Sequence, residues 1–511
     1  LEDLWGELQP QIHQREALSK RYGMDLRSKS DPQIAETVLK KRCEIALGRR
    51  LYKADIDYDK RFKFEMPSFI RYTLPQLIEV KRLVEQAEFK ITRQPSKKRP
   101  GEESYSVAMP PELDGLTVKI GATTYKLGIG GLHSREKRTC HKAEGGMVIR
   151  DRDVASYYPS LILNSGRWPA ALGEMFLTQY GGIKSERLNG KHTQATLEAD
   201  GDTTSQRYID AKVDNEGGKL QLNGTFGKTG SVYSILFAPE MFIQTTLSGQ
   251  LSLLMLIEWH ETLGISVVSA NTDGVVVKCH EDMLPVSDAI CQSWEVATGL
   301  ELEATPYAAI YSRDVNNYFA ITTGGKIKRK GAFAKGGIRT NPGADICADA
   351  VGEYLAHGTP IEQTIRTCQD LRKFIVVTRV NGGGGVKMWG EGPRKGARVS
   401  EMEPVLIANG WVKEGRAKWR KGAQLLSAGQ AYPLCFPPQR PEYLGKVVRW
   451  YYGTNSPGHI EYKNDGSTVG MSYGAKPCMV MPDEFPDDID YQWYIDKATN
   501  MLRDVGALAS P

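Results

Sequence analysis

Histidine and cysteine are scarce in this sequence, and the cysteines are scattered. Its 511 residues include eight of each, and the cysteines between Cys43 and Cys478 form no Cys-x-x-Cys pair and no disulfide framework. This distribution is typical of a reducing compartment. His133, Cys140 and His141 could begin a zinc site, but no fourth ligand accompanies them, so we do not expect one. The sequence also lacks a G-x-S-x-G motif, which leaves a hydrolase triad unsupported.

Long apolar runs and a strong charge of one sign are missing as well. No run of about 18 apolar residues and no signal-peptide pattern is present, so we expect a soluble, cytoplasmic protein. The formal net charge of +5 permits a polyanionic partner without requiring one. With 41% hydrophobic residues the chain can bury several cores, which predicts roughly two to four domains.

Local signals predict helices and strands in the N-terminal part. Ser30 to Gln33 resembles a capping box with proline in the first turn, and apolar residues at helical spacing follow it. A second helical pattern begins after Pro75. The stretch RQPSKKRPGEES, residues 93–104, has no periodicity and predicts a loop or linker. Short strands are expected through residues 116–134.

The stretch SANTDGVVV, residues 269–277, lies between two apolar β-type runs. Asp-Gly between alternating apolar residues is a strong hairpin signal, and it can have a structural role alone, without any catalytic or binding role for the aspartate. Alternatively, the carboxylate of Asp273 at the hairpin tip is a ligand that meets a partner from elsewhere in the chain.

Residues 145–163, GGMVIRDRDVASYYPSLIL, contain such a partner. Their alternation predicts a strand with Asp151 and Asp153 on one face, and a helix capped by Ser156 with Pro159 in its first turn should follow. A carboxylate at a strand end beside the free N–H groups of a helix start can hold a metal next to a phosphate. A buried strand with a solvated aspartate is the alternative.

The segment KLQLNGTFGKTG, residues 219–230, is not a phosphate-binding P-loop. A Walker A motif needs a glycine where this segment has a leucine, and it needs a buried strand upstream where this chain is polar. The segment is better interpreted as a helix that presents Lys219, Asn223 and Phe226 or Gly227 on one face. A cation, an amide and an aromatic ring on one face could contact a triphosphate and a base together.

These three segments, in this order, resemble motifs of the family B DNA polymerases. DVASYYPSLI resembles the first palm motif D-x-x-S-L-Y-P-S-I-I, KLQLNGTFG is similar to the fingers motif K-x-x-x-N-S-x-Y-G, and NTDG stands where the family has D-T-D-S. KIKRKGAF, residues 326–333, resembles the lysine-rich strand that contacts the primer duplex, and YKLGIGGLHS is a weaker match to the Y-x-G-G segment. Together the matches cover about 210 residues. Phrases such as TPYAAIYSRDVNNYFAI resemble the phage branch of the family.

The resemblance implies an α+β fold, arranged as a right-hand polymerase with an antiparallel-sheet palm, short helical fingers and a mixed thumb. The implied domains are an N-terminal helical region with a palm-linking segment (1–146), a first part of the palm (147–183), the fingers (184–234), a second part of the palm (235–340) and the thumb (341–511).

The implied activity is that of a DNA-templated DNA polymerase, which extends a primer 3′ end with deoxynucleoside triphosphates by two-metal-ion phosphoryl transfer. The expected cofactor is a pair of Mg²⁺ ions, with Mn²⁺ as a substitute. The expected partners are primer–template DNA, deoxynucleoside triphosphates and replication accessory proteins. We expect a monomer that does not associate with membranes and that, if phage-encoded, acts in the host cytoplasm.

The resemblance also implies roles for individual residues. The two ions would be held by Asp153 and Asp273, with the Val154 carbonyl as a further ligand. The residues expected to contact the nucleotide are Ser156, Tyr157, Tyr158, Arg187, Lys191, Lys219 and Asn223. Those expected to contact DNA are Gly130, Gly131, Gly227, Thr272, Lys328 and Lys330. For the two lysines a solvated charged strand is the alternative. Tyr158 would be the steric gate that excludes a 2′ hydroxyl.

Three positions depart from the family pattern, since Asn271 replaces the first aspartate of D-T-D, Gly274 the serine, and Phe226 the tyrosine. Loss of the first aspartate should weaken catalysis rather than abolish it, and it leaves the metal preference open. Asp151 has no counterpart in the family, and we interpret it as a solvated or accessory carboxylate. The alternative function is therefore a catalytically weak or inactive polymerase-like DNA-binding scaffold subunit.

The D-x-E motif of a proofreading exonuclease does not precede the palm motif. The acidic stretch at 55–59 lacks the glutamate and predicts a loop. Either the nuclease was removed with a missing N-terminal part or this branch lacks it, and we favour removal because the chain starts mid-pattern. The gap of about 66 residues between Asp153 and Lys219 is short for the insertion of protein-primed members, which predicts an ordinary primer.

The predicted thumb carries basic residues interleaved with Trp411 and Trp419. Such a surface suits duplex phosphates, although a solvated charged face is the alternative for each residue. The basic residues are Arg394, Lys395, Arg398, Lys413, Arg416, Lys418, Arg420 and Lys421.

Overall fold

The computed structural model describes residues 2–95, 103–336, 340–390, 398–415, 418–435 and 441–508. The chain divides into two compact units, Leu1–Asn316 and Asn317–Pro511. Both helices and antiparallel strand pairs are abundant, which confirms the α+β class. The five-part domain division stays a prediction. None of the helices in the described residues has the length and apolar character needed to cross a membrane.

The first unit combines one large sheet with two groups of helices. Its helices are α1 (Glu2–Tyr22), α2 (Asp31–Leu47), α3 (Pro75–Gln86), α4 (Tyr157–Asn164), α5 (Met175–Ala199), α6 (Gln206–Thr229), α7 (Pro239–Thr262) and α8 (Leu284–Thr298). Its strands are β1 (Arg61–Lys63), β2 (Glu88–Pro95), β3 (Glu103–Val107), β4 (Thr117–Ile120), β5 (Thr123–Lys126), β6 (His133–Ser134), β7 (Thr139–Lys142), β8 (Met147–Val154), β9 (Ser266–Asn271), β10 (Gly274–His280) and β11 (Leu302–Asp314).

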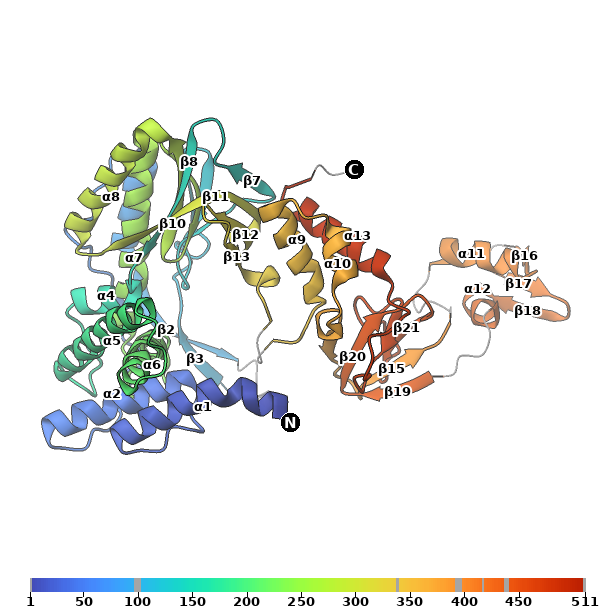
Figure 1. Ribbon diagram of the computed structural model, residues 1–511, viewed down its shortest axis with the longest axis horizontal. Coiled ribbons are helices and arrows are strands. Elements are labelled where there is room, and N and C mark those ends of the chain that lie inside the picture. The colour runs from blue at the N-terminus through green and yellow to red at the C-terminus, as the bar shows by residue number, and fades with distance from the viewer. Residues whose placement is uncertain are drawn as a thin grey trace. The chain divides into compact units, whose positions relative to one another are not determined.

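The large sheet places β8 at its centre. Its strands follow the order β11-β8-β10-β9-β6-β5-β4, and β7 pairs with β11. Helices α7 and α8 cover one face of the sheet (Figure 1), where Arg152 of β8 forms an ion pair with Asp288 of α8. Because side chains alternate along a strand, Asp151 and Asp153 lie on the opposite face. We call this second face the open face.

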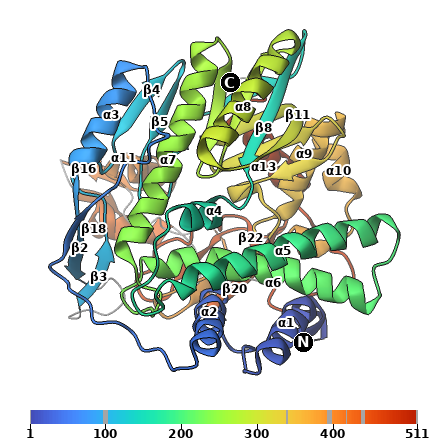
Figure 2. The same ribbon diagram turned by 90° about the vertical axis from the view of Figure 1, so that its left-hand side faces the viewer.

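The second group of helices is built around the antiparallel pair α5 and α6. The two helices approach closely at Gly190 and Gly218, where a Cβ would lie 2.6 Å from side-chain carbons of the other helix. Helices α1 and α2 pack against α6 (Figure 1). The short helix α4 contacts α5 and α6 and also α7 of the sheet layer (Figure 2), so it joins the two groups.

Both of the predicted N-terminal helices are confirmed. In α2 the backbone N–H of Ser30 donates to the Gln33 side chain at 2.9 Å, as a capping box requires, and Ile34 and Val38 are buried. Helix α3 starts at Pro75 as predicted.

The predicted linker at 93–104 is wrong where the structure describes it. Strands β2 and β3 pair with each other from Ile91 opposite Val107 to Pro95 opposite Glu103, so both ends of the stretch belong to a hairpin. Residues 96–102 lie outside the described residues. The sequence does not indicate this pairing, because its side chains alternate only weakly between polar and apolar.

The second unit contains several small sheets. Its helices are α9 (Asp345–His357), α10 (Ile361–Thr367), α11 (Val399–Ala408), α12 (Ala428–Ala431) and α13 (Tyr491–Asp504). Its strands are β12 (Asn317–Thr322), β13 (Ile327–Arg329), β14 (Val376–Arg379), β15 (Gly385–Met388), β16 (Val412–Glu414), β17 (Lys418–Lys421), β18 (Gln424–Ser427), β19 (Pro441–Gly445), β20 (Val447–Tyr452), β21 (His459–Tyr462) and β22 (Ala475–Pro477). The sheets are β14-β20-β22, β19-β15-β21 and β16-β17-β18, and β12 pairs with β13.

The two tryptophans predicted to interleave with basic residues are instead buried. Trp411 and Trp419 are 3% and 1% exposed and form a small hydrophobic core with α11 and α12. Two of the basic residues around them are already paired, Lys413 with Glu403 and Arg420 with Glu414. The prediction that these tryptophans lie on the surface among the basic residues is therefore wrong, because a large apolar indole ring is more stable in a packed core than in water. Contact between the basic residues and duplex phosphates stays a prediction. Arg394, Lys395 and Arg416 lie outside the described residues.

Candidate active site

The backbone brings the two predicted metal-binding carboxylates to adjacent strand ends. Strands β9 and β10 form the predicted hairpin, with Thr272 and Asp273 at its tip. Gly274, the first residue of β10, pairs with Asp153 of β8. The N–H of Val154 then donates to the carbonyl of Asp273 at 2.7 Å. The two aspartates therefore meet through strand register, although 120 positions separate them along the chain.

Gly274 fits this register because it has no side chain. A Cβ at position 274 would lie 2.9 Å from the Arg152 carbonyl oxygen and would collide with the Asp153 carboxylate. The departure from the family's serine thus leaves room for Asp153 in this structure.

The predicted Y-x-G-G segment lies directly against the hairpin tip. The N–H of Thr272 donates to the Leu132 carbonyl at 2.8 Å. Gly131 has φ of 136°, and a Cβ there would lie 3.0 Å from the Thr272 side chain and 3.2 Å from its Cα. Gly131 is therefore needed both for its backbone conformation and for its close contact with the tip.

Gly131→Ala is expected to destabilise the first unit by about 1–3 kcal/mol, because the added methyl group meets both φ strain and the Thr272 backbone. The matched control is Gly130→Ala, since a methyl group added at position 130 would meet no other described residue within 4 Å and the backbone there has no left-handed φ. Urea denaturation of both variants measures the difference. Equal stabilities of the two variants would contradict the contact.

Ser156 does not cap α4 as predicted. Its φ of 49° is left-handed, whereas a capping side chain normally sits on an extended backbone, and its hydroxyl accepts no bond from the helix. Instead the Ser156 Oγ accepts from Arg187 Nη1 of α5 at 2.6 Å. The rest of the prediction is confirmed, because α4 begins at Tyr157 and Pro159 lies in its first turn.

A row of aromatic rings links α4 to α6 and α7. Tyr158 stacks on Phe226 with ring centroids 4.1 Å apart, and Phe226 stacks on Phe242 at 5.1 Å. The Tyr158 hydroxyl donates to the Gly130 carbonyl at 3.2 Å, which ties the ring to the Y-x-G-G segment. Burial, together with the charge of Asp273, raises the pKa of Tyr158 to about 12. The phenol therefore remains a neutral donor across the physiological range.

Tyr157 has a different role from its neighbour. Its hydroxyl donates to the Gly249 carbonyl of α7 and lies 2.8 Å from the Ser252 hydroxyl, and its side chain is buried. Burial raises the pKa of Tyr157 far above its ordinary value. This side chain anchors α4 to α7. Contact between the backbone N–H of Tyr157 and a nucleotide phosphate stays a prediction.

The predicted helix at 219–230 is confirmed as the last part of α6. Lys219, Asn223 and Gly227 are all exposed, while Leu222 between them is buried. Spacing of four residues places the three exposed positions on one face, as the sequence predicts.

A cavity of about 270 Å³ lies among these elements. Its walls come from the end of β8, the start of α4, α5, α6 and the hairpin tip. The lining residues are Val154, Ser156, Tyr157, Tyr158, Pro159, Arg187, Lys219, Leu222, Asn223 and Asp273. Eight of these ten are predicted site residues, drawn from four separate stretches of the chain.

Some predicted residues do not line this cavity. Asp153 lies beside it through its pairing with Gly274. Lys191 on α5 instead forms an ion pair with Glu303 of β11 at 2.9 Å, with both side chains at least half exposed. An exposed pair of this kind contributes only about 0–1 kcal/mol, so little free energy opposes its rearrangement.

Two residues near the site were not predicted. Glu303 pairs with Asp153 across β11 and β8, so both carboxylates lie on the open face. Lys184 donates to the Ser160 hydroxyl at 2.9 Å and lies one helical turn before Arg187. The three-residue spacing of Lys184 and Arg187 on a helix could have identified the lysine, but the position of Glu303 depends on strand register alone.

Arg187 is the best candidate in the cavity for an anion contact. Its Nε is buried and has no hydrogen-bond partner among the described residues. Burial lowers the pKa of Arg187 and Glu303 opposes this shift, yet a guanidinium remains charged at neutral pH. A buried cationic donor without a partner carries a desolvation cost that a bound phosphate oxygen would remove.

The donor atoms near the hairpin tip fit a hard cation. Two carboxylates and a backbone carbonyl are oxygen donors of the type that Mg²⁺ prefers. Among the described residues no three His, Cys, Asp or Glu side chains gather as a metal-binding group, and the predicted set contains only two such side chains. The interpretation of Asp151 as solvated is wrong, because it is 6% exposed and accepts a hydrogen bond from Tyr307.

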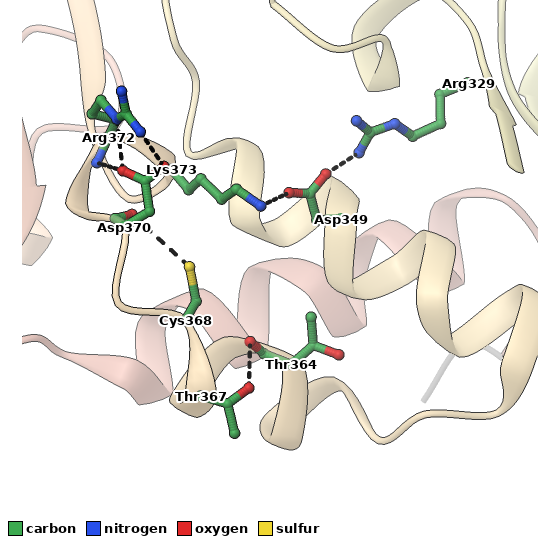
Figure 3. Close-up of polar contacts among 8 residues, drawn as sticks. All are labelled: Arg329, Asp349, Thr364, Thr367, Cys368, Asp370, Arg372 and Lys373. Atoms are coloured by element: carbon green, nitrogen blue, oxygen red, sulfur yellow. Dashed lines mark hydrogen bonds and ion pairs between the residues drawn. The ribbon is translucent and has the colours of Figure 1, made fainter. Parts of the chain in front are cut away.

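The predicted DNA-contacting lysines lie in the second unit. Lys328 is in β13 and Lys330 follows it, and the side chain of Arg329 between them is only 8% exposed. Figure 3 shows Arg329 pointing to Asp349 of α9, which it meets at 2.7 Å, while Lys373 reaches the same carboxylate at 2.9 Å. Alternation along the strand turns the neighbouring lysines away from this largely buried pair.

The chain matches no protein-family model and no curated protein sequence. Among solved structures it is similar to the family B DNA polymerase from the hyperthermophilic archaeon Pyrobaculum calidifontis, with a TM-score of 0.46 and 13% sequence identity. The similarity covers 99% of this chain and 55% of the archaeal chain, so the chain spans about half the length of that protein.

Proposed function

We propose that this protein is a DNA-templated DNA polymerase, and that its first unit carries the palm and fingers of a right-hand architecture. The observation that carries the proposal is the cavity between β8, α4, α5, α6 and the hairpin tip. It collects an acidic group, two cations, an amide and two tyrosine rings, which together match the needs of a deoxynucleoside triphosphate.

Different residues of the cavity would contact different parts of the substrate. Lys219 and Arg187 would hold the triphosphate, because both are cations on facing helices of the fingers. Asn223 would lie against the nascent base pair. Asp153, Asp273 and the Val154 carbonyl would hold two Mg²⁺ ions. When bound, such ions lower the pKa of the primer hydroxyl and neutralise charge on the phosphates.

Positioning rather than a nucleophilic side chain would provide most of the rate. Phosphoryl transfer requires the attacking and leaving oxygens to be held in line, with charge stabilised around them. The hydrogen bonds among Val154, Asp273, Thr272 and Leu132 hold the hairpin tip in place before substrate binds. The tip would therefore be preorganised for the reaction.

An inactive DNA-binding scaffold is the second candidate, and Asn271 is the observation that favours it. This residue replaces a carboxylate of the family motif, and its amide Nδ2 donates to the Val315 carbonyl at 3.4 Å while its Oδ1 accepts from Thr272 at 3.2 Å. Asn271 thus has a structural role in the hairpin and supplies no charge.

Primer extension separates the two candidates. The purified chain is incubated with a labelled primer–template, the four deoxynucleoside triphosphates and either Mg²⁺ or Mn²⁺. Template-dependent extension is the result expected of a polymerase. Tight primer–template binding without extension in either metal would support the scaffold and reject the polymerase.

Tyr158→Ala is expected to raise incorporation of ribonucleotides relative to deoxyribonucleotides by about 10- to 100-fold, since the ring would no longer occupy the space of a 2′ hydroxyl. The control is Tyr158→Phe, which keeps the stack on Phe226 and loses only the bond to the Gly130 carbonyl. Single-nucleotide incorporation with paired sugar substrates gives the ratio. An unchanged ratio in Tyr158→Ala would remove this residue from the sugar site.

A further inference from the structure

A second cavity, of about 750 Å³, lies at the opposite end of the large sheet from the candidate active site. Its lining includes Met147, the first residue of β8, and Lys278 near the end of β10. Asp153 follows Met147 by six positions along β8, which corresponds to about 20 Å at about 3.3 Å per residue. The described lining residues of the two cavities do not overlap. A volume of this size is typical of sites for small organic ligands.

Residues 135–138, which we call the crossing segment, form one wall of this cavity. At the start of the segment the N–H of Arg135 donates to the Thr124 carbonyl of β5 at 2.9 Å. At its end the N–H of Arg138 donates to the Arg313 carbonyl of β11 at 3.1 Å. Strands β8, β10, β9 and β6 lie between β11 and β5 in the sheet. The crossing segment therefore spans the sheet and encloses the cavity against β9 and β10.

Four basic side chains line the cavity, Arg135, Lys137, His141 and Lys278. In the described part of the chain, none of the arginine and the two lysines forms an ion pair. Burial and the charge of Lys278 lower the pKa of His141, so the ammonium lies near the imidazole. Cations gathered around one cavity without carboxylate partners favour an anionic ligand group, because it would offset their mutual repulsion.

Glu136 of the crossing segment supplies an acceptor to the same cavity. Its Oε1 accepts from the Ser269 hydroxyl of β9 at 2.7 Å. Its Oε2 is buried and has no hydrogen-bond partner among the described residues. A buried carboxylate oxygen without a donor carries a desolvation cost, which an N–H donor of a ligand would remove. The other lining carboxylate, Glu261, already accepts from the Val267 N–H at 2.7 Å.

The cations and Glu136 together select the chemistry of a ligand. The ligand needs an anion for the cations and an N–H donor for a single carboxylate oxygen. A nucleotide whose base carries an exocyclic amino group, as adenine and cytosine do, has both. Two adjacent N–H donors, as on guanine, suit a carboxylate with both oxygens free, whereas Ser269 occupies one oxygen of Glu136. A DNA backbone would meet the exposed Arg135 and Lys137 and leave the Glu136 oxygen without a donor.

We propose that this cavity is a binding site for a nucleoside monophosphate whose base carries an exocyclic amino group, with AMP as its representative. The amino group would donate to Glu136, and the phosphate would lie among Arg135, Lys137 and Lys278. The inference does not rest on the proposed polymerase function, because the site is separate from the candidate active site and a monophosphate is not a substrate for primer extension.

Isothermal titration calorimetry of the whole chain, without DNA, tests the site with three probes. They are AMP, purine riboside 5′-monophosphate, which lacks only the amino group, and adenosine, which lacks only the phosphate. AMP is expected to bind with a Kd below about 1 mM. Loss of the amino group should weaken binding by about 10-fold, because the donor to a charged acceptor is removed. Loss of the phosphate should weaken it by at least about 10-fold. Absence of AMP binding would overturn the inference.

Two variants assign the contacts. Glu136→Gln is expected to lower the preference for AMP over purine riboside 5′-monophosphate from about 10-fold to about twofold. Lys278→Gln should weaken both monophosphates alike, by about 3- to 10-fold, and leave adenosine unchanged. Lys142→Gln is the matched control, since Lys142 does not line the cavity and lies 3.5 Å from Glu144. A full preference for AMP in Glu136→Gln, or equal losses in the two lysine variants, would reject the proposed contacts.

A second measurement uses the protein without substitutions in the cavity. The NMR signal of the His141 Cε1–H group, assigned by its loss in His141→Gln, is followed against pH with and without AMP. Bound phosphate is expected to raise the pKa of His141 by about 1, since its negative charge opposes that of Lys278. The same pKa with saturating AMP as without it would contradict a phosphate at this position.

Duplex DNA is the alternative occupant of the basic wall, and the same NMR signal tests it. If duplex DNA changes the His141 signal and AMP does not, the cations contact DNA and the inference is overturned. If AMP binds as expected and no primer is extended, the nucleotide site stands and the polymerase proposal fails. If primers are extended and AMP does not bind, the polymerase stands and the inference fails.

Discussion

Replacing Asp153 or Asp273 with asparagine is expected to lower the rate of primer extension by about 10³-fold or more, which corresponds to at least ~4 kcal/mol of lost transition-state stabilisation. Each change removes a charged oxygen donor while it keeps the size of the side chain. Because Asp153 pairs with Gly274 through the backbone, the strand register should survive both substitutions. Rapid-quench measurement of single-nucleotide incorporation gives the rate.

Asp151→Asn is the matched control for this prediction. Asp151 lies on the same strand and the same face as Asp153, but it is buried and bonded to Tyr307 rather than placed at the cavity. Its replacement is expected to reduce the incorporation rate by less than about 10-fold. Primer–template binding by all three variants should stay within about threefold of the unchanged protein, because the ligands act on the reacting phosphates. A loss in Asp151→Asn as large as in Asp153→Asn would contradict a specific metal-binding role for Asp153, since Asp151 does not line the cavity.

Asp349→Ala is expected to destabilise the second unit by about 3–5 kcal/mol. The change leaves Arg329, whose side chain is only 8% exposed, without its carboxylate partner inside the protein. It also releases Lys373 from the same carboxylate (Figure 3). Guanidinium denaturation monitored by circular dichroism measures the loss.

Asp370→Ala provides the control, since the Asp370–Arg372 pair is close by but more exposed to solvent (Figure 3). The side chain of Arg372 is 79% exposed, so loss of this pair should cost less than about 1 kcal/mol. A double change of Arg329→Met and Asp349→Leu should recover most of the stability, because it leaves no buried charge unpaired. Similar losses in Asp349→Ala and Asp370→Ala would reject the buried pair as a determinant of stability.

The same pair predicts how stability depends on pH. Burial alone would raise the pKa of Asp349, but Lys373 and Arg329 together hold it below its ordinary value. A folded-state pKa below the unfolded one stabilises the protein above the unfolded value of about 3.9. That contribution is lost as the pH falls through the folded-state pKa, so the difference between Asp349→Ala and the unchanged protein should shrink in acid.

Local chemistry allowed several elements to be predicted from the sequence. Asp-Gly between apolar runs determined the β9–β10 hairpin, and the Ser30 capping box determined the start of α2. The spacing of Lys219, Asn223 and Gly227 was enough to place them on one exposed helix face. Each of these features depends on neighbours within a few residues, where steric and hydrogen-bond preferences are strong.

Interactions between distant residues could not be predicted in the same way. The Ser156 side chain fits the sequence pattern of a helix cap. Its hydroxyl instead accepts a hydrogen bond from Arg187 of another helix. Trp411 and Trp419 fit a DNA-binding surface by spacing, yet packing with α11 and α12 buries them. Many side chains compete for each partner, and only the packed chain decides which pair forms.

The sequence by itself determined which residue types were present for phosphate, metal and base contacts, and which short segments carried them. Only the tertiary structure decided that β8, α4, α5, α6 and the hairpin tip enclose one cavity, that Glu303 joins the open face, and that Glu136 borders a second cavity. The physical reason is that strand register and helix packing set positions between segments. These depend on burial summed over the whole core, which no short stretch of sequence contains.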